Sequence, residues 1–190
     1  MPPRSYHLLL LASLMLAGCG GSRPPWADGA MVRSEAPADA PPQDLRDLPG
    51  RLTALHNRER SAVAAAPLRW DTSLAAAAAA YGPALERLGR LAHSPVEGRT
   101  GQGENLWMGT RGAYPVDQMV GSWAAERRLF EPGTFPEVSR SGHWSDVAHY
   151  TQMIWPATVR FGCAVHRSAQ WDFLICRYAP AGNVVGQRVP

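Results

Sequence analysis

Two strand-like runs near the C-terminus limit the fold of this 190-residue chain more than any other feature. Apolar side chains occupy every second position from Val159 to Val165, and the run from Trp171 to Tyr178 is rich in aromatic and β-branched residues. Both patterns are typical of β-strands. Because only a short segment separates the runs, they predict an antiparallel hairpin, and therefore a domain that contains a sheet.

The register of this hairpin places two of the three cysteines opposite each other. With the tip between Ala169 and Gln170, Cys163 and Cys176 become cross-strand partners. A non-hydrogen-bonded pair brings two such cysteines close enough for a disulfide. The third cysteine, Cys19, is predicted to carry a lipid, for reasons given below. The pairing of the other two therefore leaves no free thiol in the chain. Two buried free thiols are the alternative, which the opposed register disfavours.

Four stretches before the hairpin have the apolar spacing of helices. They are residues 48–63, 71–88, 115–123 and 147–154. The alanine run at 75–80 favours the second helix, while Gly82-Pro83 within it predicts a kink or an interruption. Helices and strands in mixed order predict a single α+β domain built in layers, and 45% apolar residues are enough to form its core.

Residues 1–18 predict a signal peptide that is not part of the fold. The apolar run from Leu8 to Leu16 follows Arg4 and is too short to span a bilayer as a stable helix. Leu16-Ala17-Gly18-Cys19 resembles a bacterial lipobox, in which cleavage precedes the cysteine and the cysteine carries lipid. This predicts an exported lipoprotein, held at the outer membrane if the cell is Gram-negative, or an extracellular protein. Ordinary secretory cleavage beside a chance cysteine is the alternative.

Residues 19–47 predict a tether between the anchor and the folded domain at 48–190. Prolines recur from Pro24 to Pro49 and apolar periodicity is absent, so we expect neither helix nor strand there. The net charge of +3 is spread along the chain without a run of basic residues. We therefore expect no nucleic-acid partner.

Four titratable residues stand out because apolar or aromatic residues flank them: His93, Glu104, Glu126 and His149. His93 follows the second predicted helix, and Glu126 follows Trp123 by three positions on the third. The four come from segments that are distant in sequence. Two imidazoles and two carboxylates could therefore meet at one cleft, but only the fold can bring them together.

At these residues the chain resembles the CAP superfamily, also called the SCP domain. Residues 148–155, AHYTQMIW, resemble its first signature, and residues 173–183, FLICRYAPAGN, resemble its second. Shorter motifs follow the family's order: HNRER at 56–60, LRWD at 68–71 and GEN at 103–105. The superfamily joins cysteine-rich secretory proteins, insect venom antigens and plant pathogenesis-related proteins. The ending at 186–188, GQR, resembles the plant branch, and the whole resemblance covers residues 48–190.

The resemblance implies a three-layer α-β-α sandwich with a cleft that holds a tetrad of two histidines and two glutamates. The matching residues here are His93, Glu104, Glu126 and His149. The family's C-terminal disulfide maps onto Cys163 and Cys176, in agreement with the hairpin register.

The tetrad predicts a divalent metal site that is not obligatory. Zinc is the first candidate because imidazole suits it, and manganese or iron are also compatible with mixed imidazole and carboxylate ligands. The alternative is a hydrogen-bonded polar cluster in which the glutamates orient the histidines.

Two classes of function follow from these residues and the resemblance. The resemblance implies a binding module for a lipid or sterol-like ligand, or for an envelope or host protein. The alternative is a metal-dependent, peptidase-like hydrolase in which Glu104 or Glu126 acts as base to a metal-bound water. No serine lies in a nucleophile elbow, so we expect no serine hydrolase. We favour binding over the metal-dependent hydrolase because no nucleophile is evident and no feature of the sequence identifies a bond to be cleaved.

The remaining histidines and one tryptophan carry separate predictions. His56 is expected to be structural, with Asn57 and Arg60 helping to tie the first helix to the core. His143 and His166 are expected to be exposed. Trp144 lies in a loop without a periodic partner, which makes it the tryptophan we expect outside the core.

Overall fold

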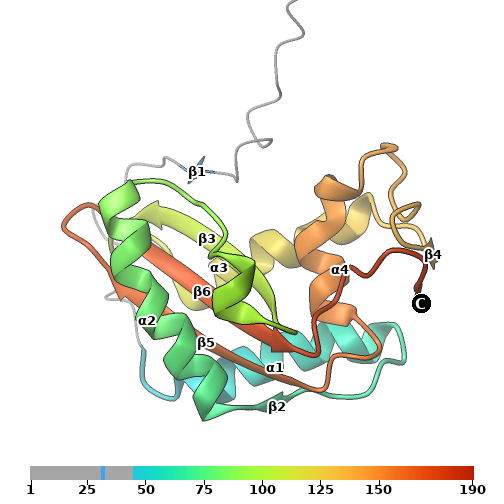
Figure 1. The fold of residues 1–190 in the computed structure, drawn as a ribbon, viewed down its shortest axis with the longest axis horizontal. Helices are drawn as coiled ribbons and strands as arrows, with labels where there is room; N and C mark the ends of the chain where they lie inside the picture. Colours follow the sequence, from blue (N-terminus) through green and yellow to red (C-terminus); the bar gives the residue numbers. More distant parts are fainter. Residues whose placement is uncertain (1–30, 33–44) are drawn as a thin grey trace, which may run out of the picture.

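The computed structural model describes residues 31–32 and 45–190 (Figure 1). Its main sheet has five strands, and a second sheet has two. The order in the main sheet is β1 (Met31–Val32), β3 (Gly103–Thr110), β6 (Trp171–Ala179), β5 (Arg160–Arg167) and β2 (Arg69–Trp70). The three long strands are antiparallel, whereas β1 and β2 run parallel to their neighbours. The small sheet pairs β4 (Gly133–Thr134) with β7 (Arg188–Val189).

The four predicted helices are present. They are α1 (Leu48–Ala62), α2 (Thr72–Leu88), α3 (Val116–Ala124) and α4 (Ala148–Ile154). Three 3-10 turns accompany them: η1 (Val96–Arg99), η2 (Ala125–Arg128) and η3 (Trp144–Val147). Asp71 caps α2 by accepting hydrogen bonds from two backbone N–H groups of its first turn, at 2.9 and 3.1 Å. Within residues 31–32 and 45–190, none of the helices has the length and apolar character needed to cross a bilayer.

Helices cover both faces of the main sheet. In Figure 1, α2 lies in front of the sheet, where Ala78 and Leu85 pack against Met108 and Phe173. On the opposite face, α1, α3 and α4 pack against a second set of strand residues. That set includes Trp107, Leu174, Cys176 and Tyr178. Successive strand residues thus serve opposite layers, as strand geometry requires. The predicted α+β fold and its three α-β-α layers are confirmed.

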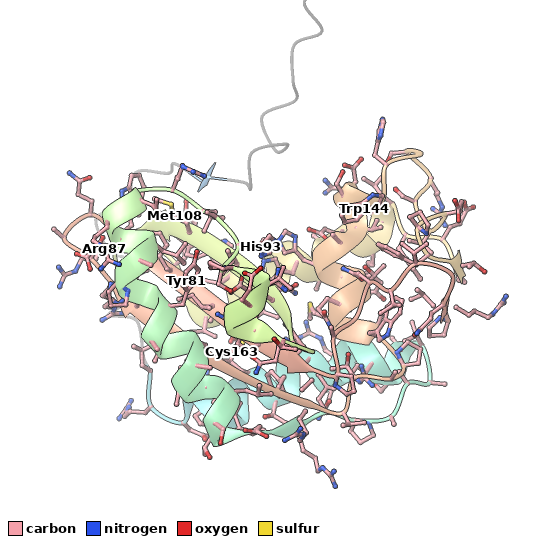
Figure 2. All side chains as sticks on the ribbon, viewed as in Figure 1. Tyr81, Arg87, His93, Met108, Trp144 and Cys163 are labelled. Atoms are coloured by element: carbon pink, nitrogen blue, oxygen red, sulfur yellow. A yellow bond between two sulfur atoms is a disulfide. The ribbon has the colours of Figure 1, made fainter. Side chains whose placement is uncertain are left out.

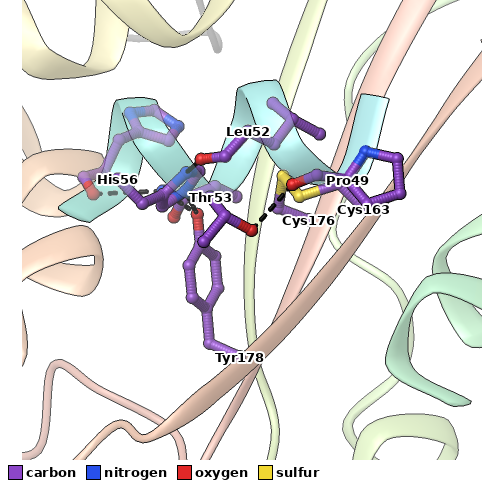
Figure 3. The surroundings of a disulfide bond; sticks show 9 residues. Pro49, Leu52, Thr53, His56, Cys163, Cys176 and Tyr178 are labelled. Atoms are coloured by element: carbon purple, nitrogen blue, oxygen red, sulfur yellow. Dashed lines mark hydrogen bonds between the residues drawn. A yellow bond between two sulfur atoms is a disulfide. The ribbon is translucent and has the colours of Figure 1, made fainter. Parts of the chain in front are cut away.

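The predicted hairpin and its disulfide are also confirmed. Strands β5 and β6 pair with Cys163 opposite Cys176, and the two sulfur atoms are bonded at 2.03 Å. Figure 3 shows the bond beside α1, next to Pro49 and Leu52. The crosslink therefore joins the two central strands beneath the first helix.

The structure contradicts two expectations around α2, an interruption at Gly82-Pro83 and an exposed His166, for one shared reason. The helix runs without interruption through Gly82 and Pro83. His166, expected to be exposed, is only 22% exposed and pairs through Nε2 with Glu86 at 2.6 Å. A Cβ on Gly82 would lie 2.5 Å from the Cβ of His166, so this glycine lets α2 lie close against β5. Packing on the sheet keeps the helix intact although Pro83 cannot donate a backbone hydrogen bond.

Of the seven strands in the described part of the chain, sequence reasoning predicted only β5 and β6. Strands β2, β4 and β7 have two residues each, too few to show a pattern, and β3 and β1 were missed for reasons of their own. Strand β3 is buried along almost its whole length between the two helical layers, so it lacks the alternation of a half-exposed strand. Strand β1 lies within the predicted tether and pairs with β3 through Met31 and Val32. The expectation of no strand in the tether is therefore wrong at these two residues, which belong to a proline-free stretch. The predicted signal peptide and Cys19 lie outside the described residues.

Candidate functional site: a cleft with two histidine–glutamate pairs

A cavity of about 510 Å³ opens between the segment around β3 and helix α4. Three of the four predicted site residues line it: His93, Glu104 and His149. In Figure 2, His93 lies on the side of the sheet and Trp144 on the side of α4. Most other lining residues are small or apolar, among them Leu91, Ala92, Leu106, Ala148 and Ala181. The cavity therefore combines apolar walls with a few polar groups, which is typical of a small-molecule site.

The first pair in this cleft is His93 with Glu104. His93 Nδ1 lies 2.7 Å from Glu104 Oε1, and the same carboxylate accepts hydrogen bonds from Ser94 N and Ser94 Oγ at 3.0 Å. Arg177, the cross-strand neighbour of Glu104, adds an ion pair at 3.1 Å. Burial alone would raise the pKa of Glu104, but the bonds from His93 and Ser94 and the charge of Arg177 hold it below its usual value. The carboxylate is therefore ionised and acts only as an acceptor.

The second pair is His149 with Glu126. His149 Nδ1 lies 2.6 Å from Glu126 Oε1, and Glu126 Oε2 accepts the backbone N–H groups of His149 and Tyr150 at 3.0 Å. Glu126 lies on η2, immediately after the third helix on which it was predicted. Its carboxylate thus satisfies N–H groups at the start of α4 that have no partner within the helix. Trp123 stacks on the imidazole of His149, with the rings 5.8 Å apart and 9° from parallel.

Both glutamates contact the Nδ1 side of a histidine, although Glu104 also belongs to the lining of the cavity. Glu126 does not line the cavity, and each carboxylate is bound to an imidazole Nδ1. Among the residues that the structure describes, no group of three or more His, Cys, Asp or Glu side chains could hold a metal ion. The predicted four-residue ligand set is therefore not arranged as one metal site. What the cleft offers is the Nε2 atoms of two imidazoles, oriented by carboxylates as metal-binding histidines commonly are.

Sequence reasoning missed a buried chain of hydrogen bonds that reaches His149. Asn105 Nδ2 donates to the carbonyl of His149 at 3.0 Å and to Tyr178 Oη at 3.3 Å. Tyr178 Oη is also 2.8 Å from His56 Nε2, and His56 Nδ1 is 2.8 Å from the carbonyl of Leu52 (Figure 3). The chain therefore connects α1, through β6 and β3, to the first turn of α4. Asn105 belongs to the GEN motif at 103–105 and is adjacent to Glu104. This position in the motif is the sequence feature that could have identified it as a site residue.

The structural role predicted for the first helix is confirmed. His56 is fully buried, and Asn57 exchanges two hydrogen bonds with the backbone of Leu68, at 2.7 and 3.1 Å. The guanidinium of Arg60 donates to four backbone carbonyls. These belong to Ala66, Met153, Trp155 and Thr158. Helix α1 is therefore bound to the end of α4 and to the segment that follows it.

The C-terminal wall of the cleft is tied to α4 by side chains whose roles were not predicted. Gln152 Oε1 accepts from Gly182 N at 2.9 Å, and Asn183 Oδ1 accepts from Thr151 Oγ1 at 2.7 Å. Asn183 Nδ2 donates to the carbonyl of Ala148 at 2.9 Å. All of these residues fall in the two signature segments. One function of the signatures is thus to hold two walls of the cleft together.

The loop before α4 agrees with its predictions. Trp144 is 47% exposed at the cavity, with its ring 5.4 Å from that of Phe135 in an edge contact. His143 is exposed and does not line the cavity. Trp144 is therefore the tryptophan of the site, and His143 is a solvated neighbour.

Comparison with known proteins finds related sequences and folds. The model of the cysteine-rich secretory protein family, CAP, matches residues 53–178. The chain is 38% identical over 149 residues to a PR-1 type pathogenesis-related protein of Sambucus nigra, covering 77% of this chain and 80% of that one. It is 32% identical over 148 residues to pathogenesis-related protein 1 of Arabidopsis thaliana, covering 77% and 85%. The crystal structure of NaASP2 with Zn²⁺ shares the fold, with a TM-score of 0.63 and 24% identity over 81% of this chain and 88% of that one.

Proposed function

This chain belongs to the cysteine-rich secretory protein family, and from that membership we propose that it is an exported binding domain. It holds a lipid or sterol-like molecule, or part of an envelope or host protein, in the cleft between β3 and α4. The observation that carries this proposal is the cavity itself, whose volume of about 510 Å³ is in the usual range of small-molecule sites. Its apolar walls and the exposed indole of Trp144 suit a ligand with an apolar body.

Binding is the function that these side chains support better than hydrolysis. A base in a metal-dependent hydrolase must accept a proton from a water held in the site. Here Glu104 and Glu126 both accept hydrogen bonds from imidazole Nδ1 atoms and from backbone N–H groups. Neither carboxylate is therefore poised to act on a water at the Nε2 atoms.

We propose that the cleft also accepts a divalent metal, preferably zinc, without depending on it. His93 and His149 would hold the ion through Nε2, and Glu104 and Glu126 would orient the two rings. A bound ion would supply a positive centre to which the polar end of a ligand could bind. Two protein ligands are fewer than zinc has in most sites, so we expect weak binding.

The domain is further proposed to be attached to a membrane through a lipid on Cys19. On this proposal, residues 1–18 are a cleaved signal peptide and residues 19–47 link the anchor to the domain at 48–190. The lipobox-like sequence supports it, as does the Cys163–Cys176 disulfide, because such bonds persist in oxidising compartments. In a bacterial host, the full chain should partition into the detergent phase, and Cys19→Ser should release it or block its processing. Equal membrane retention of both forms would refute the anchor.

Ligand binding is tested on the purified full chain by mass spectrometry of organic extracts and by titration with lipid probes, followed by tryptophan fluorescence. We expect extracted lipid, and weaker probe binding by Trp144→Ala. A chain that yields no lipid and binds no probe would overturn the proposal.

The metal is tested separately by calorimetric titration with zinc. The double variant His93→Ala/His149→Ala should lose most of its zinc affinity. The matched control His143→Ala/His166→Ala removes two histidines outside the cleft and should keep that affinity. Equal binding by the cleft variant and the parent would show that the tetrad is only a structural polar cluster.

A further inference from the structure

Strand β3 is the edge of the main sheet along the cleft. Its outer neighbour, β1, is only two residues long and pairs with Met108 and Gly109 (Figure 1). In the part of the chain that the structure describes, no strand therefore pairs with residues 103–107 on this side. Residues 104–106 line the cavity together with residues 91–93 and residues of α4, and they form what we call the floor of the cleft.

The hydrogen-bond pattern of the sheet determines where the backbone of this floor points. In an antiparallel pair, positions that exchange hydrogen bonds alternate with closer positions that do not. Cys163 and Cys176 are of the closer kind, with a Cα–Cα distance of 4.1 Å, so Cys176 directs its backbone N–H and C=O toward β3. There it pairs with Asn105. The flanking residues Glu104 and Leu106 consequently direct their N–H and C=O groups away from β6, out of the edge of the sheet.

These outward groups belong to buried residues of the cavity wall. Glu104 and Leu106 are both buried, and both line the cavity. No backbone hydrogen bond from another described residue reaches their outward N–H and C=O groups. A buried backbone group without a partner costs free energy, and a row of such groups along a strand edge is a template for another extended chain. The floor is therefore suited to an added strand.

Strand β1 pairs with this same edge just beyond the floor. It runs parallel to β3, with Met31 opposite Met108 and Val32 opposite Gly109. Continued toward lower residue numbers, this register sets residues 26–30 opposite residues 103–107. The chain that leads into β1 is therefore aligned with the floor.

The sequence before β1 permits a longer strand. Residues 26–32, WADGAMV, contain no proline, whereas Pro24 and Pro25 precede them and could not donate to a ladder. The proline-free stretch thus begins at the residue that the register sets opposite Gly103, where β3 begins. Because residues 26–30 are joined directly to β1, they meet the floor at the high effective concentration of an intramolecular contact.

We propose that residues 26–30 extend β1 along β3 and cover the floor of the cleft. In the register of β1, the N–H of Asp28 donates to the carbonyl of Glu104, and the carbonyl of Asp28 accepts from the N–H of Leu106. Alanine, aspartate and glycine are poor strand formers, so the segment is weakly held and a ligand that reaches the floor can displace it. This contact rests on the pairing of β1 with β3 and does not depend on which ligand the cleft binds.

Amide hydrogen exchange of the full chain, followed by NMR, tests the contact at the N–H groups of Glu104 and Leu106. Asp28→Pro removes the N–H that the ladder needs, and it should speed exchange at both groups about tenfold, the factor that corresponds to roughly one hydrogen bond. Asn105 is the internal reference, because its N–H bonds to β6 and should exchange equally slowly in every form. The substitution lies outside the domain at 48–190, so the folding of that domain does not depend on it.

Ala27→Pro is the matched control. In this register the N–H of Ala27 points away from β3, so proline is tolerated there and exchange should stay as slow as in the parent. The residue before a proline is restricted to extended backbone, which a strand has in both variants.

The outcomes separate the possible occupants of the floor. Equal exchange in the parent and in Asp28→Pro, or equal acceleration by both prolines, overturns the proposal. If exchange is slow in both, dependence on protein concentration identifies a strand from a second copy, and acceleration after organic extraction identifies a bound ligand. Neither result decides the proposed function, which the organic extracts and lipid probes test separately.

Discussion

The buried imidazole of His56 predicts that the protein loses stability in mild acid. His56 is fully buried, with Nδ1 at the Leu52 carbonyl and Nε2 at Tyr178 Oη. Burial lowers its pKa from 6.5 to about 4; the bond to Leu52 opposes this shift and the charge of Arg60 adds to it. The imidazole of His56 therefore stays neutral in the folded protein at pH values at which it is protonated in the unfolded chain.

The sign and size of the effect follow from proton linkage. Between pH 6.5 and about 4, the unfolded chain binds up to one proton more than the folded protein does at this residue. The free energy of unfolding therefore falls as the pH falls, by at most about 1.4 kcal/mol per pH unit and by about 3 kcal/mol over the whole window. The contribution of His56 is complete above pH 6.5 and is lost towards pH 4.

The assay is urea unfolding, followed by tryptophan fluorescence, at a series of pH values from about 7.5 to 4.5. His56→Gln should be less stable than the parent at neutral pH, by about 1–3 kcal/mol, because it disturbs a buried hydrogen-bond chain. Its stability should then depend less steeply on pH. The carboxyl groups of Asp71 and Glu104 have lowered pKa values, so their contributions to the free energy of unfolding are lost only at more acidic pH. Both groups are unchanged in the variant. The difference between the two slopes therefore isolates His56.

An exposed histidine provides the control. His143→Gln should keep both the stability and the pH slope of the parent, because His143 is solvated in the folded protein. If His56→Gln shows the same slope as the parent, the buried imidazole is not the source of the pH dependence and the reasoning is wrong.

Two further predictions concern the framework. Replacing Cys163 and Cys176 by alanine should lower the free energy of unfolding by about 3 kcal/mol, because the disulfide closes a loop with a sequence separation of 13; urea unfolding measures this. Non-reducing peptide mapping of exported protein should find the pair joined, and free thiols at both positions would contradict it. Gly162→Ala should cost several kcal/mol, since its Cβ would overlap the backbone at residues 71–75. Gly121→Ala, with open space around its Cβ, should be neutral or stabilising by about 0.5–1 kcal/mol; equal losses in both variants would refute the steric argument.

Sequence alone determined the elements whose signals are local. The alternation in β5 and β6 predicted the hairpin, and the register that follows from its tip predicted the pairing of Cys163 with Cys176. The spacing of apolar residues predicted all four helices, because a helix repeats its buried face every three to four residues. The residues of the cleft were found by their motifs, which resemble those of the family.

Tertiary structure decided where those residues point and what covers them. Strand β3 carries no alternation because both of its faces are buried, and Gly82 reveals its role only where α2 meets His166. The same holds for Glu104 and Glu126, whose types and spacing suit metal ligands but whose carboxylates bind imidazole Nδ1 atoms. Whether a carboxylate faces a cavity or a ring depends on how segments far apart in the chain approach each other. Local sequence does not determine how these distant segments approach each other. The packing of the helical layers on the sheet determines it.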